Sequence, residues 1–303
     1  MSENFLALAR RGNNQWWRYL LGILFILLLW QGIGSIPYIL LLVYLQRDGS
    51  PATQFNLQTQ KFEGVPPLIP YIAINLMFVC FLIGLYITIR FLHQRQFITL
   101  ITPRNQVSWK RILQGFGVTV ILLALASVIE SVITPGNYRF TFNLRQFLIF
   151  LPVALVLTPL QTSVEEFFFR GYLMQGIALK TRNAIIPIVL SSFLFMLPHL
   201  LNPEVKSGFF LSAAYYLVFG LFMALITIKD NCLELALGIH AGNNLYNALF
   251  ASYADGAIPA PSIFTIQELN PQYNLLSTLI IFTLFYLFFF RRRKQETQRL
   301  GED

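Results

Sequence analysis

The sequence predicts an all-α fold, a polytopic transmembrane bundle of about eight helices with both termini in the cytoplasm. Composition is the first reason, because 55% of the 303 residues are hydrophobic and only 12% are charged. Soluble domains carry about twice that share of charge. The second reason is that apolar residues gather in runs near the ~20 residues that cross a ~30 Å hydrocarbon core. The same composition excludes disordered, collagen-like and disulfide-stapled proteins.

Eight apolar runs of near-spanning length follow one another along the chain. The first is too long for a signal-peptide core and lacks a small-residue cleavage site after it, so we expect it to remain as a span. Polar loops rich in Pro, Gly, Gln and Asn occupy 46–67 and 254–274. The predicted spans are Tyr19–Leu45, Leu68–Leu92, Ile112–Thr134, Phe147–Gln161, Ala184–Leu201, Phe209–Ile228, Leu233–Tyr253 and Leu275–Phe290.

The basic residues orient these spans. With a cytoplasmic N-terminus, 17 of the 22 lysines and arginines fall in cytoplasmic segments. The outer segments keep Arg47, Lys61, Arg139, Arg145 and Lys206. Such an excess is the positive-inside signal of membrane proteins. We therefore expect an integral membrane protein, of the bacterial plasma membrane or a related internal membrane, with the lipid bilayer as its surroundings.

Two features that often indicate other functions do not do so in this sequence. The net charge of +8 comes from short basic clusters between apolar runs, with no basic stripe or aromatic-basic module, so we expect no nucleic acid partner. Cys80 and Cys232 lie in apolar runs and are interpreted as buried hydrophobes. The chain divides into 1–145 with three spans, a catalytic core at 146–253, and 254–303 with an outer loop, the last span and a basic cytoplasmic tail.

Ionisable residues inside spans are costly and usually functional. Two adjacent carboxylates and an arginine lie in the apolar stretch Thr162–Tyr172. On a helix, Glu166 and Arg170 share a face at i, i+4, with the acid on the favoured N-terminal side. Glu165 lies about 100° round the helix and lacks that partner. The two carboxylates are therefore expected to have different roles.

Two later spans each carry a histidine. Phe195 and His199 are i, i+4 neighbours in one span, and His240 and Asn244 are in another. At 1.5 Å per residue, both histidines and Glu165 lie about 16–22 Å from the cytoplasmic ends of their helices, so they can meet at similar depth. The third histidine, His93, follows a span and is interpreted as an interfacial residue.

The stretch that carries Glu165 is too long for a simple span. Gln146 to Lys180 would measure about 52 Å as one helix. We expect a break or kink near Pro159, because proline removes a backbone donor. The helix with the carboxylates would then begin inside the membrane.

A carboxylate near two histidines and an asparagine suits amide hydrolysis. Glu165 would act as general base on water, His199 would orient that water or protonate the leaving amine, and His240 with Asn244 would stabilise the oxyanion. Alternatively, Glu165, His199 and His240 would hold Zn²⁺, which activates the water. Membrane-embedded Glu and His also line proton and ion pathways in transporters, and Glu166 with Arg170 is also consistent with a purely structural ion pair.

The ordered set Glu165-Glu166-x-x-x-Arg170, Phe195-x-x-x-His199 and His240-x-x-x-Asn244 resembles the CPBP family. These are the CAAX protease and bacteriocin-processing membrane proteins, also called the Abi or type II CAAX prenyl endopeptidase family. The resemblance covers roughly Gln146 to Tyr253.

The resemblance implies an intramembrane endopeptidase with a cavity opening toward the cytoplasm. Glu165 matches the water-activating residue of the family, and Glu166 and Arg170 match its structural pair, with Phe195 supporting the site. The family is commonly described as metalloprotease, with a metal-free glutamate mechanism as the competitor. The implied substrate is a membrane-associated peptide or protein, either a prenylated CAAX type or a bacteriocin-like peptide. Some relatives resemble immunity, regulatory or scaffold proteins without proteolysis, which is the alternative function.

Overall fold

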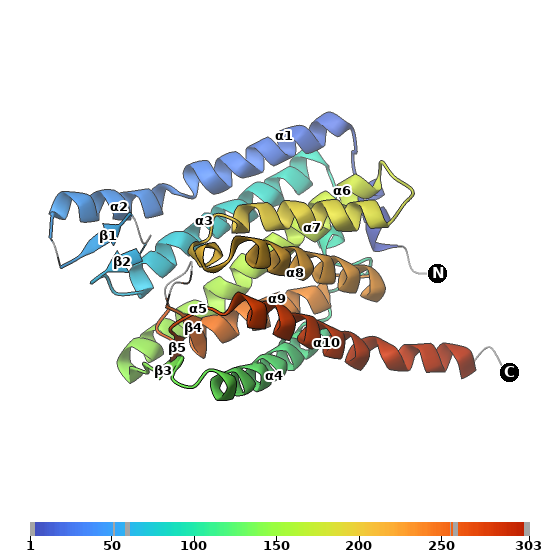
Figure 1. Ribbon diagram of the computed structural model, residues 1–303. Helices are drawn as coiled ribbons and strands as arrows, with labels where there is room; N and C mark the ends of the chain where they lie inside the picture. The colour runs from blue at the N-terminus through green and yellow to red at the C-terminus, as the bar shows by residue number, and fades with distance from the viewer. Residues whose placement is uncertain (1–3, 51, 58–60, 255, 257–259, 300–303) are drawn as a thin grey trace.

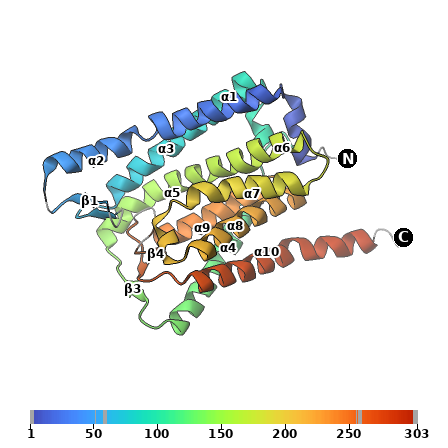
Figure 2. The same cartoon turned by 45° about the horizontal axis from the view of Figure 1, so that its top comes forward.

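The computed structural model describes residues 4–50, 52–57, 61–254, 256 and 260–299. Within these ranges the protein is a bundle of long helices that run back and forth between two ends (Figure 1). Both termini lie at the same end in the two views of the bundle (Figures 1 and 2). We call that end, with the loops 93–108, 179–184 and 231–233, the basic end. The opposite end, with the loop 134–143, the loop 200–208 and the described residues of the loops 49–67 and 250–270, is the strand end.

The helices alternate with short loops in chain order. In the described part of the chain, three 3-10 helices lie outside the long segments, η1 (Phe5–Arg11), η4 (Phe97–Leu100) and η6 (Pro203–Ser207). The long segments are α1 (Trp16–Leu27) with η2 (Leu28–Ile33) and α2 (Ile36–Asp48), α3 (Leu68–Ile87) with η3 (Thr88–Leu92), α4 (Trp109–Ile133), α5 (Leu144–Glu166) with η5 (Phe167–Met174) and α6 (Gln175–Ala178), α7 (Ile185–His199), α8 (Phe209–Asp230), α9 (Glu234–Leu249) and α10 (Pro271–Arg299).

The all-α prediction is confirmed, and each of the eight predicted spans overlaps one long helical segment. Among the described residues, six segments are long and apolar enough to cross a membrane. The other two are α7, with 15 residues, and α9, with 16. Both of the short helices carry a site histidine, and both pack within the bundle against α8.

The expected break near Pro159 is wrong. The helix runs without interruption through Pro152 and Pro159 to Glu166. The helix becomes irregular only after Glu166, where η5 has the wider π-helical turn from Phe167 to Met174. Such π segments inside α-helices frequently mark functional sites. The wider turn follows directly after the two adjacent carboxylates of the motif.

His93, expected to be an interfacial residue at a helix end, packs inside the protein at the end of η3. Its side chain is buried, and its ring nitrogens contact the backbone oxygen of Asn13 at 2.7 Å and the hydroxyl of Tyr172 at 3.0 Å. Burial lowers the pKa of His93 to about 4, so the imidazole is neutral at neutral pH. His93 therefore fastens the basic end of α3 to η5.

Helix α9 lies inside the bundle, in contact with α4, α5 and α8 (Figure 2). Every residue from Glu234 to Gly242 is buried. A helix that is apolar on all sides belongs in the interior of a bundle. This position makes His240 a buried polar group that needs partners, because an unpaired polar group in an apolar interior is costly.

Glycines let α4 and α9 approach closely. A Cβ atom on Gly238 would lie 2.1 Å from the backbone oxygen of Ile112 and 2.8 Å from the backbone nitrogen of Phe116. Real Cβ atoms do not approach that closely, so a larger residue must push the two helices apart. The backbone contact in turn fixes the position of His240, which lies about half a turn further along α9.

Gly238→Val is expected to lower the free energy of unfolding by about 1–3 kcal/mol, because overpacking shifts α4 away from α9. Thermal unfolding in detergent measures the change. Gly117→Val is the matched control, since nothing lies within 4 Å of a Cβ at Gly117 on α4. Equal unfolding temperatures for the two variants would contradict the close packing of α4 on α9.

Among the described residues, five short strands, which the sequence did not predict, lie at the strand end. β1 (Gln54–Asn56) pairs antiparallel with β2 (Lys61–Glu63). β5 (Phe264–Ile266) lies between β3 (Tyr138–Phe140), antiparallel to it, and β4 (Ala251–Tyr253), parallel to it. This three-stranded sheet ties the loops after α4 and α9 to the loop before α10.

Candidate active site

Glu166 is the buried anchor of the site. It ends α5, and its Oε1 accepts a hydrogen bond from Arg170 Nη1 at 2.9 Å, with both side chains fully buried. Arg170 Nη2 donates to the backbone oxygen of Gly220 in α8 at 3.1 Å. Its guanidinium lies over the ring of Phe195 in α7, 4.4 Å from the centroid. One arginine therefore connects α5, α7 and α8 behind the site.

His240 lies between the two carboxylates. Its Nδ1 is 2.8 Å from Glu166 Oε1, and its Nε2 is 3.7 Å from Glu165 Oε2. A carboxylate can only accept, so we assign the Nδ1 proton to the bond with Glu166. The spacing of the motif indicated the Glu166–Arg170 pair but gave no sign of the bond between Glu166 and His240. That bond fixes the imidazole ring and aims Nε2 at Glu165.

Glu165 faces a cavity, whereas Glu166 faces the protein. Glu165 Oε1 accepts from Gln161 Nε2 at 3.4 Å, and Glu165 Oε2 has no hydrogen-bond partner. Glu165 lines a cavity of about 260 Å³, which Glu166 and Arg170 do not reach. The adjacent carboxylates thus differ as their helical positions indicated, because Glu166 is paired with a cation whereas Glu165 lines the cavity.

His199 ends α7 and lines the same cavity. Its Nδ1 donates to the backbone oxygen of Phe195 at 2.7 Å, which leaves the lone pair on Nε2 when the ring is neutral. The ring packs between Phe195 and Tyr216, with centroids 4.4 Å and 4.6 Å away. Two aromatic neighbours and the backbone bond therefore hold the imidazole in one orientation.

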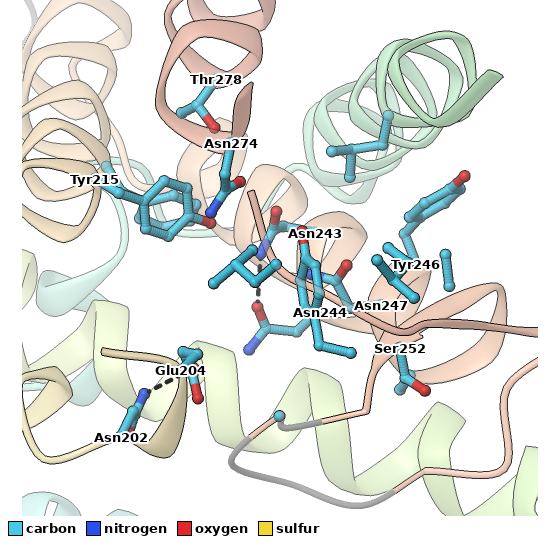
Figure 3. Close-up of a pocket in the computed structure, with 18 of the residues that line it drawn as sticks. Asn202, Glu204, Tyr215, Asn243, Asn244, Tyr246, Asn247, Ser252, Asn274 and Thr278 are labelled. Atoms are coloured by element: carbon cyan, nitrogen blue, oxygen red, sulfur yellow. Dashed lines mark hydrogen bonds between the residues drawn. The ribbon is translucent and has the colours of Figure 1, made fainter. Parts of the chain in front are cut away.

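Asn244 lies one turn after His240 and also lines the cavity. Its Oδ1 accepts from Asn243 Nδ2 at 3.0 Å, the bond drawn between these two side chains in Figure 3. This bond leaves the Asn244 amide nitrogen as a donor. The structure therefore gathers Glu165, His199, His240 and Asn244 at one cavity, from three helices. Phe195 joins them in the lining.

Further polar residues of the cavity were missed by the sequence interpretation. Glu204, in η6, accepts from the Tyr216 hydroxyl at 2.8 Å and from Asn202 Nδ2 at 3.3 Å. No periodic pattern marks a residue of a short loop, so the sequence carried no signal for Glu204. The labelled lining in Figure 3 includes Asn202, Glu204, Tyr215, Asn243, Asn247 and Asn274.

The zinc interpretation calls for a cluster of ligands. Within the part of the chain that the structure describes, no group of three or more His, Cys, Asp or Glu side chains has the arrangement of a metal site. The predicted donors Glu165, His199 and His240 do share the cavity. However, the Nδ1 of His240 is engaged by Glu166, which leaves only its Nε2 for any ligand.

Two comparisons with known proteins bear on this site. The model of a family described as type II CAAX prenyl endopeptidase Rce1-like matches residues 144–246. The matched residues run from the start of α5 into α9 and include the four predicted site residues Glu165, His199, His240 and Asn244. The chain is also 31% identical over 292 residues to the uncharacterized protein YyaK of Bacillus subtilis (strain 168), covering 95% of this chain and 96% of the relative.

Proposed function

Since the chain belongs to the Rce1-like family of type II CAAX prenyl endopeptidases, we propose that it is an intramembrane endopeptidase that cleaves a membrane-associated peptide with water activated by Glu165. The observation that carries the proposal is the position of Glu165, which lines the cavity together with His240. Its Oε2 is buried, has no hydrogen-bond partner and lies 3.7 Å from His240 Nε2. A water bound at this end of the cavity would have Glu165 as proton acceptor and an imidazole beside it.

In this mechanism Glu165 Oε2 takes a proton from water as the oxygen attacks the carbonyl carbon of the peptide bond. His199 Nε2, with its lone pair toward the cavity, orients the same water. The proton then passes from the Glu165 carboxyl to the leaving nitrogen as the C–N bond breaks. The products are a new carboxylate and a new amine, so one water is consumed for each bond.

The oxyanion of the tetrahedral intermediate needs donors. The Asn244 amide supplies one, and His240 supplies a second through Nε2–H when its ring is protonated. Glu166 holds the imidazole in place for this role, because it accepts the Nδ1 hydrogen at 2.8 Å.

Zinc held by Glu165, His199 and His240 is the competing proposal for water activation. Zinc would supply a Lewis acid and a bound water of lowered pKa. The two proposals differ in whether activity depends on stoichiometric metal. As the location we propose the bacterial plasma membrane, which is consistent with the relative from Bacillus subtilis.

Metal removal and a histidine variant test the mechanism together. Purified wild type is incubated in detergent with a farnesylated CAAX peptide and an unprenylated membrane peptide, with and without chelator, and bound zinc is quantified. We expect cleavage to survive the chelator, and His240→Gln to lower kcat about 10²- to 10³-fold through loss of an oxyanion donor.

His93→Gln is the matched control, because His93 is the one histidine of the chain that lies outside the cavity lining. Cleavage abolished by the chelator and restored by zinc would refute the metal-free mechanism. Activity in the His240→Gln variant equal to wild type would refute the role of His240. If wild type cuts neither peptide, and the Glu165→Gln variant still performs the protein's task in the cell, the protein is a scaffold or regulatory protein.

A further inference from the structure

The cavity extends from the site toward one end of the bundle only. Its lining on α5 is Thr158, Gln161 and Glu165, so the site carboxylate is the lining residue nearest the basic end of that helix. The other helices that line the cavity also contribute the parts that lie toward the strand end. These parts are Tyr71 of α3, Leu123–Glu130 of α4, Phe195 and His199 of α7, Leu211–Phe219 of α8, His240–Ala248 of α9 and Pro271–Thr278 of α10.

The lining continues into the loops of the strand end. Tyr138, Glu204 and Ile266 belong to β3, η6 and β5, and Ala251–Tyr253 is β4. Among the described residues that line the cavity, none comes from the loops of the basic end. Behind the site, Glu166 and Arg170 are fully buried and Phe169 is 4% exposed. These side chains close the floor of the cavity toward the basic end.

The distribution of charge tells which side of the membrane the strand end faces. The basic end carries both termini and most of the lysines and arginines, which the positive-inside rule places in the cytoplasm. The strand end is then the outer end. The resemblance to CAAX proteases implied a cavity that opens toward the cytoplasm, and the cavity of this chain instead runs toward the end predicted to be outer.

The charged groups of the wall favour a positively charged occupant, and they lie among apolar and aromatic side chains such as Phe195, Leu211 and Phe219. Apart from tyrosines, the ionisable residues of the described lining are three acids, Glu130, Glu165 and Glu204, and two histidines, with no lysine or arginine among them. Glu204 Oε2 is buried and has no hydrogen-bond partner. Amide side chains add polar groups on α9, α10 and the loop before η6, at Asn202, Asn243, Asn244, Asn247 and Asn274.

We propose that the substrate is an unprenylated peptide segment with a positive charge near the scissile bond, and that it reaches Glu165 from the outer face of the membrane. This inference rests on the proposed function, since it names the substrate class and route of the same site. Glu204 would pair with the cationic residue, and the asparagine amides would hold the peptide backbone. An isoprenoid tail at the cytoplasmic face would lie at the opposite end of the bundle from this route.

The route is tested by labelling single cysteines in the full chain. A membrane-impermeant maleimide is applied to right-side-out and inside-out vesicles of an expressing bacterial plasma membrane. Asn274→Cys probes the cavity, Arg139→Cys the exposed strand end and Lys110→Cys the exposed basic end. The unmodified chain, with its half-buried Cys80 and buried Cys232, gives the background.

We expect Asn274→Cys and Arg139→Cys to react in right-side-out vesicles, and Lys110→Cys to react only in inside-out vesicles. Reaction of Asn274→Cys only in inside-out vesicles, or in neither preparation, would overturn the outer route. Reaction of Arg139→Cys only in inside-out vesicles would overturn the orientation, and the proposal with it.

The substrate class is tested by protection of Asn274→Cys in detergent. The probes are an unprenylated peptide of Ala and Ser with one central Lys, the same peptide with Glu, and a farnesylated CAAX peptide. We expect the Lys peptide to protect at about tenfold lower concentration than the Glu peptide, and Glu204→Gln to remove most of that difference. Equal protection by Lys and Glu peptides, or strongest protection by the farnesylated one, would overturn the substrate class.

Both tests measure the labelling of cysteines and not peptide cleavage, so they separate this inference from the proposed function. Outer labelling and protection by the Lys peptide, with no cleavage by folded wild type, would refute proteolysis and leave the binding route standing. Cleavage that depends on Glu165, with labelling of Asn274→Cys from the cytoplasmic side, would support the enzyme and refute the route.

Discussion

Glu165→Gln is expected to lower kcat/KM about 10²- to 10⁴-fold, the range that general acid–base groups contribute. Glutamine keeps the size of the side chain and can still contact Gln161, but it cannot take a proton from water. The loss should appear in kcat, because the carboxylate acts on the water during bond cleavage. Steady-state kinetics on a cleaved peptide in detergent measure the effect.

Glu234→Gln is the control for this variant. Glu234 is also fully buried, but it lies near the basic end, where its Oε1 accepts from the backbone nitrogen of Ser108 at 3.2 Å. The folded fraction of Glu234→Gln should cleave at the wild-type rate. Wild-type activity in the Glu165→Gln variant would show that Glu165 is not the general base, whatever the activity of the histidine variants.

Arg170→Met is expected to lower the free energy of unfolding by about 3–5 kcal/mol, the cost of leaving a buried charge without its partner. Glu166 would lose its arginine, and the backbone oxygen of Gly220 would lose its donor. The effect should exceed that of any exposed arginine, since screening by water is absent around these fully buried side chains. Chemical or thermal unfolding in detergent measures the difference.

A double variant separates the lost charge pair from lost packing. Glu166→Gln added to Arg170→Met removes the unpaired carboxylate, so part of the stability should return. Arg139→Met, at an exposed position, should stay within about 0.5 kcal/mol of wild type. If Arg170→Met also stays within that range, the buried ion pair does not hold α5, α7 and α8 together.

Hydropathy predicted the helices because a helix that crosses a membrane needs apolar side chains along its whole length. Every predicted span overlaps a helix, and the i, i+4 spacing of Glu166 and Arg170 ends in a direct bond. The same spacing placed His199 one turn from Phe195, whose backbone oxygen accepts its Nδ1 hydrogen. Local periodicity was sufficient for these features, since both partners lie on one helix.

Features that join distant segments gave no such signal. The bond from His240 to Glu166 spans 74 residues and depends on how α9 packs against α5. The helix does not break at Pro159, because a proline within a long packed helix does not have to end it. The irregular turn is the π-helical one after Glu166. Glu204 comes from a loop whose position only the packed bundle sets.

The direction of the cavity was likewise beyond sequence reasoning. The four residues of the family motifs fix the floor of the site, but the opening depends on which side chains fill the bundle above and below them. Phe169, Glu166 and Arg170 fill the side toward the basic end, whereas amides and hydroxyls line the side toward the strand end. The resemblance therefore indicated which residues lie together at the cavity, whereas the direction in which the cavity runs depends on the packed bundle.

Hydrolysis by Glu165-activated water is tested most directly by following the oxygen of the water into the product, which works for any peptide substrate. Purified wild type and Glu165→Gln are incubated in H₂¹⁸O with a peptide library prepared from bacterial membrane proteins, and new carboxyl ends are read by mass spectrometry. We predict ¹⁸O-labelled carboxyl ends that form with wild type and not with Glu165→Gln. Labelled ends that form equally with both proteins, or with neither, would contradict the proposed enzyme.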